Sequence, residues 1–254
     1  MQMTAAARSD VLRHVIFAPF DNGERAVAIA DRMRTAILLD VFADGEQLPS
    51  EAELAAQFGV SPVTLREALS LLRAAGLVET RRGRSGGSFV RRTDYNPEVL
   101  GRQKLAEIST LDLRDLLDWR SSVAQACAAM AAERASDEEV EDLHVLVEAF
   151  ETAPDAMTAR LCEGRIHVCL AAASQSVRHT KATVQVLIDC GSMLSLVFAS
   201  PILRERVAKS HRDLYDHVRL GDRVGAAASA AESANRIQQA LAALARDLQK
   251  GKVS

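Results

Sequence analysis

Residues 48–92, LPSEAELAAQFGVSPVTLREALSLLRAAGLVETRRGRSGGSFVRR, decide the fold of the N-terminal part of this chain. Ser50, followed three residues later by a glutamate, predicts a capping box at the start of one helix, and Gly59 predicts the end of that helix. Ser61 can cap a second helix, with Pro62 at its first position, where the missing N–H costs nothing. The segment therefore predicts two helices joined by a tight turn.

A short basic hairpin is expected after the second helix. Gly76 predicts the end of that helix, and a stripe of leucines at helical spacing predicts its buried face: Leu65, Leu69 and Leu72. Residues 77–80 and 88–90 have the composition of two short strands, with an arginine-rich turn between them. Helix, turn, helix and hairpin in this order predict a winged helix-turn-helix, whose second helix enters the major groove of DNA.

The distribution of charge favours DNA as the partner. Between residues 60 and 92 the chain has seven arginines and two acidic residues, a balance of +5, whereas the whole chain carries −3. A basic patch on a mildly acidic protein is typical of a surface that binds phosphates. The alternative is a solvated basic loop between domains. The position of the patch behind two capped helices favours the DNA-binding interpretation.

The rest of the chain is expected to be helical, so that the fold class is mainly α. Aromatic residues make up 4% of the 254 residues, and this composition, rich in Ala and Leu, favours helices over β-sandwiches. We expect no apolar run of membrane-spanning length and no signal peptide. Four cysteines without C-x-x-C spacing indicate buried, reduced thiols in a cytoplasmic protein: Cys127, Cys162, Cys169 and Cys190.

Four segments are expected along the chain. A leader over residues 1–23 precedes the winged helix-turn-helix domain over residues 24–93, which has a small β wing. Residues 94–108 are expected to form a linker, because an Asn-Pro pair there is a turn signal. Residues 109–250 show helical patterns separated by turn residues, and they predict an antiparallel all-α bundle of six or seven helices.

The N-terminal segment resembles the DNA-binding domain of GntR-family bacterial transcription regulators. The resemblance covers residues 24–92 and rests on LPSE, the GVS turn, LREAL, the GLV helix exit and the GGSFV wing. It implies that the second helix lies in the major groove and that a wing glycine approaches the minor groove. The DNA contacts that it implies by position are Ser61, Thr64, Arg66, Arg82 and Gly83.

These implied contacts have different expected roles. Arg66 is the candidate for bidentate recognition of a guanine. Ser61 and Thr64 are expected to bind phosphate oxygens, which position the protein on the duplex. Many family members have an arginine where this chain has Pro62, and some have another where it has Ala52. The preferred bases are therefore expected to differ from the commonest operators of the family.

The helical part resembles the FCD ligand-binding domain of the FadR branch of that family. The resemblance covers residues 109–245, and its carriers are DLRDLLDWRSSVAQACAAMAAERASDEE near the start and HRDLYDHVRLGDRVGAAASA near the end. Most FCD domains hold a divalent metal between an aspartate and three histidines. The matching positions here are Glu163, His167, His211 and Ser233, so that one histidine is missing.

Two interpretations of these positions stay open. In the first, Glu163, His167 and His211 form a site for Zn, Ni or Mn, with water or a ligand oxygen in the open positions. In the second, the metal has been lost, and the residues bind an anionic effector directly or satisfy one another in the core.

Arg120 matches an arginine that commonly faces the pocket of FCD domains. The family usually has a glutamate four residues later, where this chain has Ala124. A guanidinium that faces a cavity would suit a carboxylate effector. The alternative is a surface arginine paired with Asp115 or Asp118. The candidate effector-binding residues are Arg120, His167, His211 and Ser233.

Together the two resemblances imply a ligand-responsive transcription regulator, expected to be a repressor and not an enzyme. A homodimer would present two recognition helices to a palindromic DNA operator. The implied effector is a small organic acid that binds the helical domain and changes operator affinity. Two other functions remain to be weighed: a metal-dependent hydrolase, and an architectural DNA-binding protein that responds to no effector.

Overall fold

The structure is a computed structural model that describes residues 26–39, 41–83, 86–91 and 97–250. The chain forms two compact units, and the division between them falls between residues 96 and 97. The leader expected over residues 1–23 lies outside the described residues.

The described residues of the N-terminal unit form a hairpin and three helices: α2 (Ala26–Leu38), α3 (Glu51–Phe58) and α4 (Pro62–Ala74). The two expected helix starts are confirmed, because Ser50 forms a complete capping box and the Ser61 side chain accepts the backbone N–H of Thr64. Gly59 ends α3 with a φ of 66°, a left-handed geometry that glycine adopts without strain. The leucine stripe expected on α4 is fully buried: Leu65, Leu69 and Leu72.

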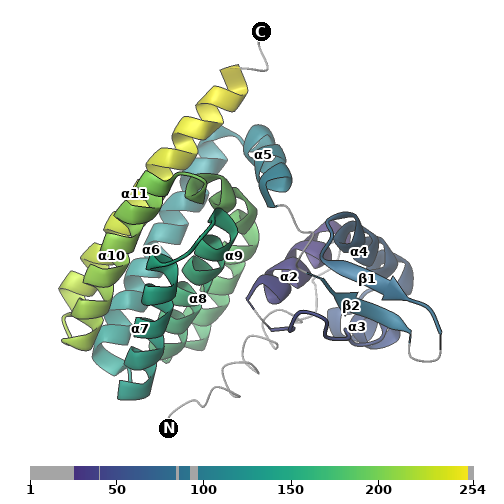
Figure 1. Ribbon diagram of the computed structural model, residues 1–254, viewed down its shortest axis with the longest axis horizontal. Helices are drawn as coiled ribbons and strands as arrows, with labels where there is room; N and C mark the ends of the chain where they lie inside the picture. The colour runs from purple at the N-terminus through teal and green to yellow at the C-terminus, as the bar shows by residue number, and fades with distance from the viewer. Residues whose placement is uncertain (1–25, 40, 84–85, 92–96, 251–254) are drawn as a thin grey trace. The chain divides into compact units, whose positions relative to one another are not determined.

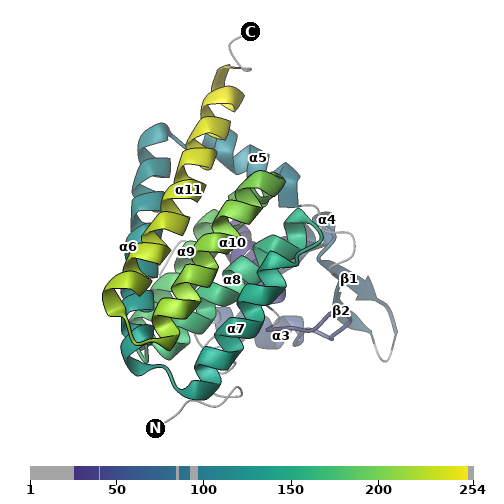
Figure 2. The ribbon, with the colours of Figure 1, turned by 60° about the vertical axis from the view of Figure 1, so that its left-hand side comes forward.

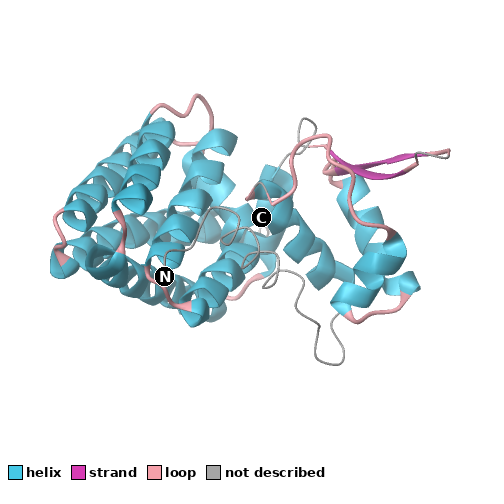
Figure 3. Ribbon diagram, turned by 90° about the horizontal axis from the view of Figure 1, so that it is seen from below, coloured by secondary structure: helices cyan, strands magenta, loops and turns pink. Residues whose placement is uncertain are grey.

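The wing is an antiparallel hairpin of β1 (Val78–Arg81) and β2 (Gly87–Val90), drawn in magenta in Figure 3. A further segment, which no sequence pattern indicated, joins the hairpin, because Gln47 forms an isolated bridge with Phe89. The two chain segments approach closely: a Cβ at Gly87 would lie 2.6 Å from Nε2 of Gln47. The wing is therefore anchored to the loop that precedes α3.

Over residues 97–250 the C-terminal unit has seven helices: α5 (Pro97–Glu107), α6 (Thr110–Arg134), α7 (Asp137–Glu151), α8 (Ala156–Ala173), α9 (Val177–Phe198), α10 (Pro201–Arg219) and α11 (Arg223–Lys250). Short turns join the helices from α6 onward into an antiparallel bundle, and Figure 1 and Figure 2 show α11 alongside α6 and α10. The expected fold class, mainly α with a small β wing and a helical bundle, is confirmed.

Helix α5 lies within the segment 94–108 that was expected to be a linker. Pro97 is its first residue, a position where the missing N–H of proline is not needed. Leu105 is fully buried in the core of the unit, and α5 packs against α9. A Cβ at Gly101 would lie 2.4 Å from the carbonyl oxygen of Ser192 on α9, so the close contact of these two helices depends on glycine.

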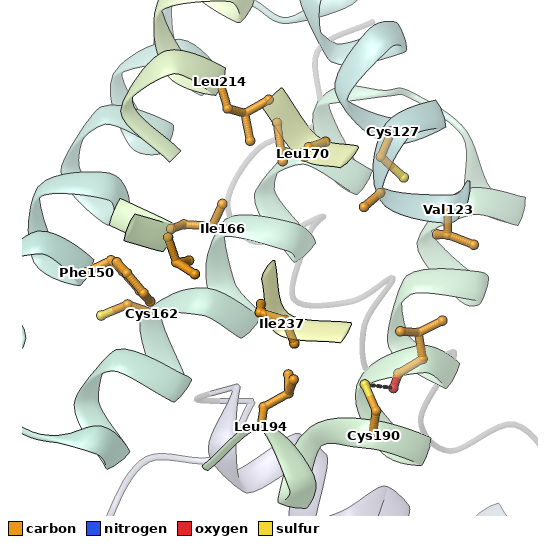
Figure 4. Packing of buried hydrophobic residues seen from close by; sticks show 14 of the residues in the cluster. Val123, Cys127, Phe150, Cys162, Ile166, Leu170, Cys190, Leu194, Leu214 and Ile237 are labelled. Atoms are coloured by element: carbon orange, nitrogen blue, oxygen red, sulfur yellow. Dashed lines mark hydrogen bonds between the residues drawn. The ribbon is translucent and has the colours of Figure 1, made fainter. Parts of the chain in front are cut away.

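Helix α9 is long and apolar enough, by length and composition, to cross a membrane, whereas no such run was expected from the sequence. Within the most apolar stretch of α9, 72% of the residues are buried inside the structure. The apolar residues of α9 are therefore core residues. Figure 4 shows Leu194 of α9 pointing into the interior of the bundle, together with Ile166 of α8 and Ile237 of α11.

The four cysteines are buried thiols, as the sequence indicated: Cys127, Cys162, Cys169 and Cys190. Burial raises the pKa of the thiols of Cys127, Cys162 and Cys190. These three thiols are therefore protonated at neutral pH, which makes them poor nucleophiles.

Candidate functional site

The N-terminus of α4 carries two of the hydroxyls expected to contact DNA. The Oγ of Ser61 accepts the backbone N–H of Thr64 at 3.1 Å and lies 3.0 Å from Oγ1 of Thr64. Ser61 is exposed and Thr64 is half-buried. Because the first turn of a helix carries partial positive charge and backbone N–H groups that point outward, this end of α4 is suited to a phosphate group.

Arg66 projects from the exposed side of α4. Its Nε lies 3.5 Å from Oε2 of Glu51, the first residue of α3, and the two side chains are 62% and 48% exposed. Exposed ion pairs of this kind contribute little to stability. The guanidinium of Arg66 can therefore exchange Glu51 for another acceptor at small cost.

The arginines of the wing that the structure describes fall into two groups. Arg81 and Arg91 bind the carboxylate of Glu79, at 2.6 Å (Nη2 to Oε1) and 2.8 Å (Nη1 to Oε2). The hydrogen bond from Arg91, and then that from Arg81, lower the pKa of Glu79. Arg82 is exposed and forms no ion pair with another described residue. Gly83 has a φ of 116°, and the space where a Cβ would project is open, so the backbone at the hairpin tip can approach another molecule closely.

Three side chains of the C-terminal unit converge on the carboxylate of Glu163. Nη2 of Arg120 lies 2.5 Å from Oε1, and Nε2 of His167 lies 3.0 Å from the same oxygen. Nε2 of His211 lies 2.5 Å from the other oxygen, Oε2. Nη2 of Arg120 is also 3.1 Å from Nε2 of His167. We refer to these four residues as the ionic cluster.

Three helices position the ionic cluster in the core of the bundle. Arg120 comes from α6, Glu163 and His167 lie one turn apart on α8, and His211 comes from α10; none of the four is more than 8% exposed. The surroundings are apolar: the ring of Phe150 meets that of His211 edge-on, with 5.0 Å between the centroids. Because water does not reach a charge at this depth, the carboxylate depends on its protein partners.

These partners determine the charge state of the ionic cluster. Burial by itself would raise the pKa of Glu163, but the attraction of His211 and His167 and their hydrogen bonds outweigh burial and hold this pKa well below its ordinary value. Burial lowers the pKa of His167, and the opposing effect of Glu163 does not reverse the shift. Near neutral pH, Glu163 is thus ionised, His167 is neutral, and Arg120 supplies the permanent positive charge.

Several buried polar atoms of the same unit have no hydrogen-bond partner among the described residues. Ser233, on α11, is 2% exposed, and its Oγ is one of these atoms; Nδ1 of His211 is another. The hydroxyls of Ser192 and Ser195, on α9, are two more. Buried polar groups are nearly always hydrogen-bonded in proteins. These atoms can therefore donate to or accept from a bound molecule.

The surface interpretation of Arg120 is wrong. Its side chain is 3% exposed and binds Glu163, while Asp118 accepts a hydrogen bond from Gln238 at 3.0 Å. Nor does the guanidinium face an open cavity without a partner. The one sequence signal for this contact is Ala124: because it supplies no acid one turn along α6, Arg120 finds its acceptor on another helix. The structure brings Arg120, Glu163, His167 and His211 together, and no hydrogen bond joins Ser233 to them.

The donor atoms, as they lie in this structure, are not spaced for the divalent metal that the FCD resemblance implied. Two ligands of one tetrahedral zinc ion lie about 3.3 Å apart. Nε2 of His211 and Oε2 of Glu163 are instead 2.5 Å apart, a direct hydrogen bond. Arg120 lies beside Oε1 of Glu163 and Nε2 of His167, two of the atoms that a metal would need. In the part of the chain that the structure describes, no group of three His, Cys, Asp or Glu residues is arranged to hold a metal ion.

Two known protein families account for most of the chain. Residues 25–90 match the family described as "Bacterial regulatory proteins, gntR family", and residues 115–236 match the FCD domain. The putative HTH-type transcriptional regulator RmpR of Mycobacterium gastri is 40% identical over 193 residues, which are 75% of this chain and 70% of that protein. The putative L-lactate dehydrogenase operon regulatory protein of Escherichia coli is 35% identical over 153 residues, which are 59% of this chain and 58% of that protein.

Solved structures with the same fold are also known. E. coli McbR/YncC has a TM-score of 0.52 at 17% identity, over 89% of this chain and 99% of that one. A GntR-family transcriptional regulator from Pseudomonas syringae pv. tomato has a TM-score of 0.51 at 20% identity, over 97% of both chains. At these identities the likeness concerns the fold alone.

Glu163→Gln should lower the free energy of unfolding by about 3–5 kcal/mol, because it leaves the buried charge of Arg120 without its counterion. Denaturant unfolding of the full chain, followed by circular dichroism, measures this loss.

Glu148→Gln is the matched control. Glu148 is an exposed residue whose Oε1 lies 3.4 Å from Nε2 of His144, one turn away on the same helix. Its substitution should change the free energy of unfolding by less than about 1 kcal/mol. Equal losses in the two variants would contradict the role given to Glu163.

Proposed function

The chain belongs to the GntR family of bacterial transcription regulators and carries an FCD domain, and from this premise we propose that it is a repressor whose operator affinity changes when a small organic acid binds the helical unit. The observation that carries the proposal is the ionic cluster, buried in the core of that unit. A buried ion pair as a whole adds little stability over apolar residues of similar size, although breaking one is costly, and perturbed ionisable groups concentrate at functional sites. An acid suits this site because guanidinium and imidazole N–H groups bind carboxylates.

DNA recognition is assigned to α4 and the wing. In this proposal Arg66 reads the edge of a guanine in the major groove, and Ser61 and Thr64 bind phosphate oxygens. Arg82 and Gly83 approach the minor groove. The exposure of Arg66, the position of the two hydroxyls at the helix N-terminus and the open space at Gly83 support these roles.

Effector binding is assigned to Arg120, His167, His211 and Ser233. An acid that enters the core would compete with Glu163 for the N–H groups of Arg120 and the histidines. The hydroxyl of Ser233, which has no hydrogen-bond partner among the residues that the structure describes, would give it a further hydrogen bond. The donors of the cluster support this role, because Arg120 and the histidines supply the N–H groups and the positive charge that a carboxylate needs.

Operator control then requires a homodimer and a coupling between two sites. A dimer presents two copies of α4 to a palindromic operator in the cytoplasm. The acid must bind more tightly to one arrangement of the two DNA-binding units than to the other, since a ligand shifts an equilibrium only by its difference in affinity for the two states. Operator binding must therefore change acid affinity by the same factor.

The families and relatives of this chain are transcription regulators and not enzymes, so the protein is a regulator and the hydrolase interpretation is set aside. The name of the E. coli relative connects that protein with an L-lactate dehydrogenase operon. This connection supports including L-lactate among the acids tested first on the present chain.

Arg66→Ala should weaken binding to a selected operator duplex by roughly 5- to 150-fold, equivalent to about 1–3 kcal/mol for a lost bidentate base contact. Binding to random DNA should weaken far less, because phosphate contacts dominate it. Fluorescence anisotropy at fixed salt with both duplexes measures the two affinities.

Arg219→Ala is the control of equal charge change, since Arg219 is an exposed residue of the helical unit whose partner is Asp216. It should leave both affinities unchanged. Equal weakening of operator and random DNA by Arg66→Ala would favour the architectural DNA-binding protein over the specific regulator.

Ser233→Ala should weaken acid binding without loss of stability, because its buried hydroxyl has no partner among the described residues. Thermal shift with acetate, L-lactate, malonate and citrate identifies an acid that stabilises the wild-type protein. A bound ligand at about 100 times its dissociation constant stabilises by about 2.7 kcal/mol, and this shift should shrink in the variant.

Ser229→Ala, one helical turn earlier on α11 and also buried, is the matched control and should keep the full shift. A shift that persists unchanged in Ser233→Ala would remove Ser233 from the site. If none of the four acids stabilises the wild-type protein, the proposed effector class is wrong.

A further inference from the structure

The guanidinium of Arg120 contacts two of the candidate metal ligands, Glu163 and His167. Its Nη2 is 2.5 Å from Oε1 of Glu163 and 3.1 Å from Nε2 of His167, so one cationic nitrogen contacts two of the three atoms that could coordinate a metal. The third atom, Nε2 of His211, is engaged with the other carboxylate oxygen at 2.5 Å. We infer that the guanidinium of Arg120 replaces the divalent metal in this chain, and that the ionic cluster is a metal-free ion pair.

The charges of the buried groups support this replacement. The carboxylate of Glu163 and the guanidinium of Arg120 cancel each other, and both are at most 3% exposed. A divalent ion bound beside them would leave an excess of two positive charges in the core. Burying uncompensated charge is strongly unfavourable. The site is therefore electrostatically complete with one cation, and the arginine is covalently part of the chain.

The neighbouring positions are consistent with a site that has lost its metal. Ala124, one turn after Arg120 on α6, is buried and supplies no second carboxylate that could offset a metal ion. Ser233 offers a hydroxyl, a much weaker ligand for Zn or Ni than an imidazole nitrogen. The missing imidazole at Ser233 and the missing carboxylate at Ala124 thus accompany the direct contact between Arg120 and Glu163.

This inference deepens the proposed function. It rests on that proposal in one respect only, that the ionic cluster is the effector-binding site. It concerns the cation of the site and needs neither DNA nor an acid. A test by metal content can therefore fail while the effector proposal stands, and the reverse is also possible.

The test begins with the wild-type protein, incubated with Zn²⁺, Ni²⁺ or Mn²⁺, dialysed, and analysed by inductively coupled plasma mass spectrometry. Metal should remain well below about one ion per chain, the amount that a structural site retains. Thermal unfolding should be unchanged by each metal. Retention of one ion per chain that disappears in His211→Ala would overturn the inference.

The converse variant restores a metal site. Arg120→Met with Ser233→His removes the competing cation and supplies a third imidazole, so it should retain about one Zn²⁺ or Ni²⁺ per chain and unfold at a higher temperature with the metal. Arg120→Lys with Ser233→His keeps the positive charge and should retain roughly tenfold less metal or none. Equal metal retention by these two variants would show that the cation at position 120 does not exclude the metal.

Arg160→Met with Ser233→His is the matched control for the loss of a buried guanidinium. Arg160 lies on α8 and is 4% exposed, and its Nε donates to the carbonyl of Gly191. This control should remain metal-free, because Arg120 is still present. If the converse variant does not fold, the metal content of the wild-type protein alone still decides between the two outcomes.

Discussion

A carboxylate with no exposed surface has to be neutralised where it lies, and in the helical unit α6, α8 and α10 do this for Glu163. The guanidinium of Arg120 supplies the countercharge, and the two imidazoles satisfy the remaining acceptor positions. Each contact crosses from one helix to another or spans one turn of α8. The ionic cluster therefore fixes how these three helices face one another, because a shift of any one helix would leave a buried polar or charged group without its partner.

Under the proposed function, the same buried charges are what a ligand binds. Buried apolar packing tolerates small changes poorly, but it does not select among charged molecules. A buried ion pair does select, since a second anion can compete with Glu163 for the donors that surround it. Two atoms without a hydrogen-bond partner in the described part of the chain, Nδ1 of His211 on α10 and Oγ of Ser233 on α11, would add to the hydrogen bonds that the proposed effector can form. In the N-terminal unit, by contrast, the ionic contact of Arg66 is exposed and readily exchanged.

Sequence reasoning succeeded where the signal was local. The Ser50 capping box, the Gly59 terminus and the leucine stripe of α4 involve residues within one or two turns of each other. Such features can be predicted from the local sequence pattern alone. Helix α5 was not predicted, and a linker was expected in its place, because this helix has no continuous apolar face. Its contact with α9 holds it in position. The bridge of Gln47 to Phe89 and the pairing of Arg120 with Glu163 join residues more than forty positions apart. Such contacts depend on the packing of whole elements, and periodicity carries no information about them.

A double-mutant cycle on Arg120 and Glu163 tests most directly whether this buried pair organises the helical unit. The free energies of unfolding of wild type, Arg120→Met, Glu163→Leu and the double variant would be measured in denaturant at neutral pH. Each single variant should be strongly destabilised by the unpaired charge, and the double variant should recover part of the loss, with a coupling of about 2–3 kcal/mol. Losses that add to within about 0.5 kcal/mol would mean that the two residues act independently, and would contradict the central role of the pair.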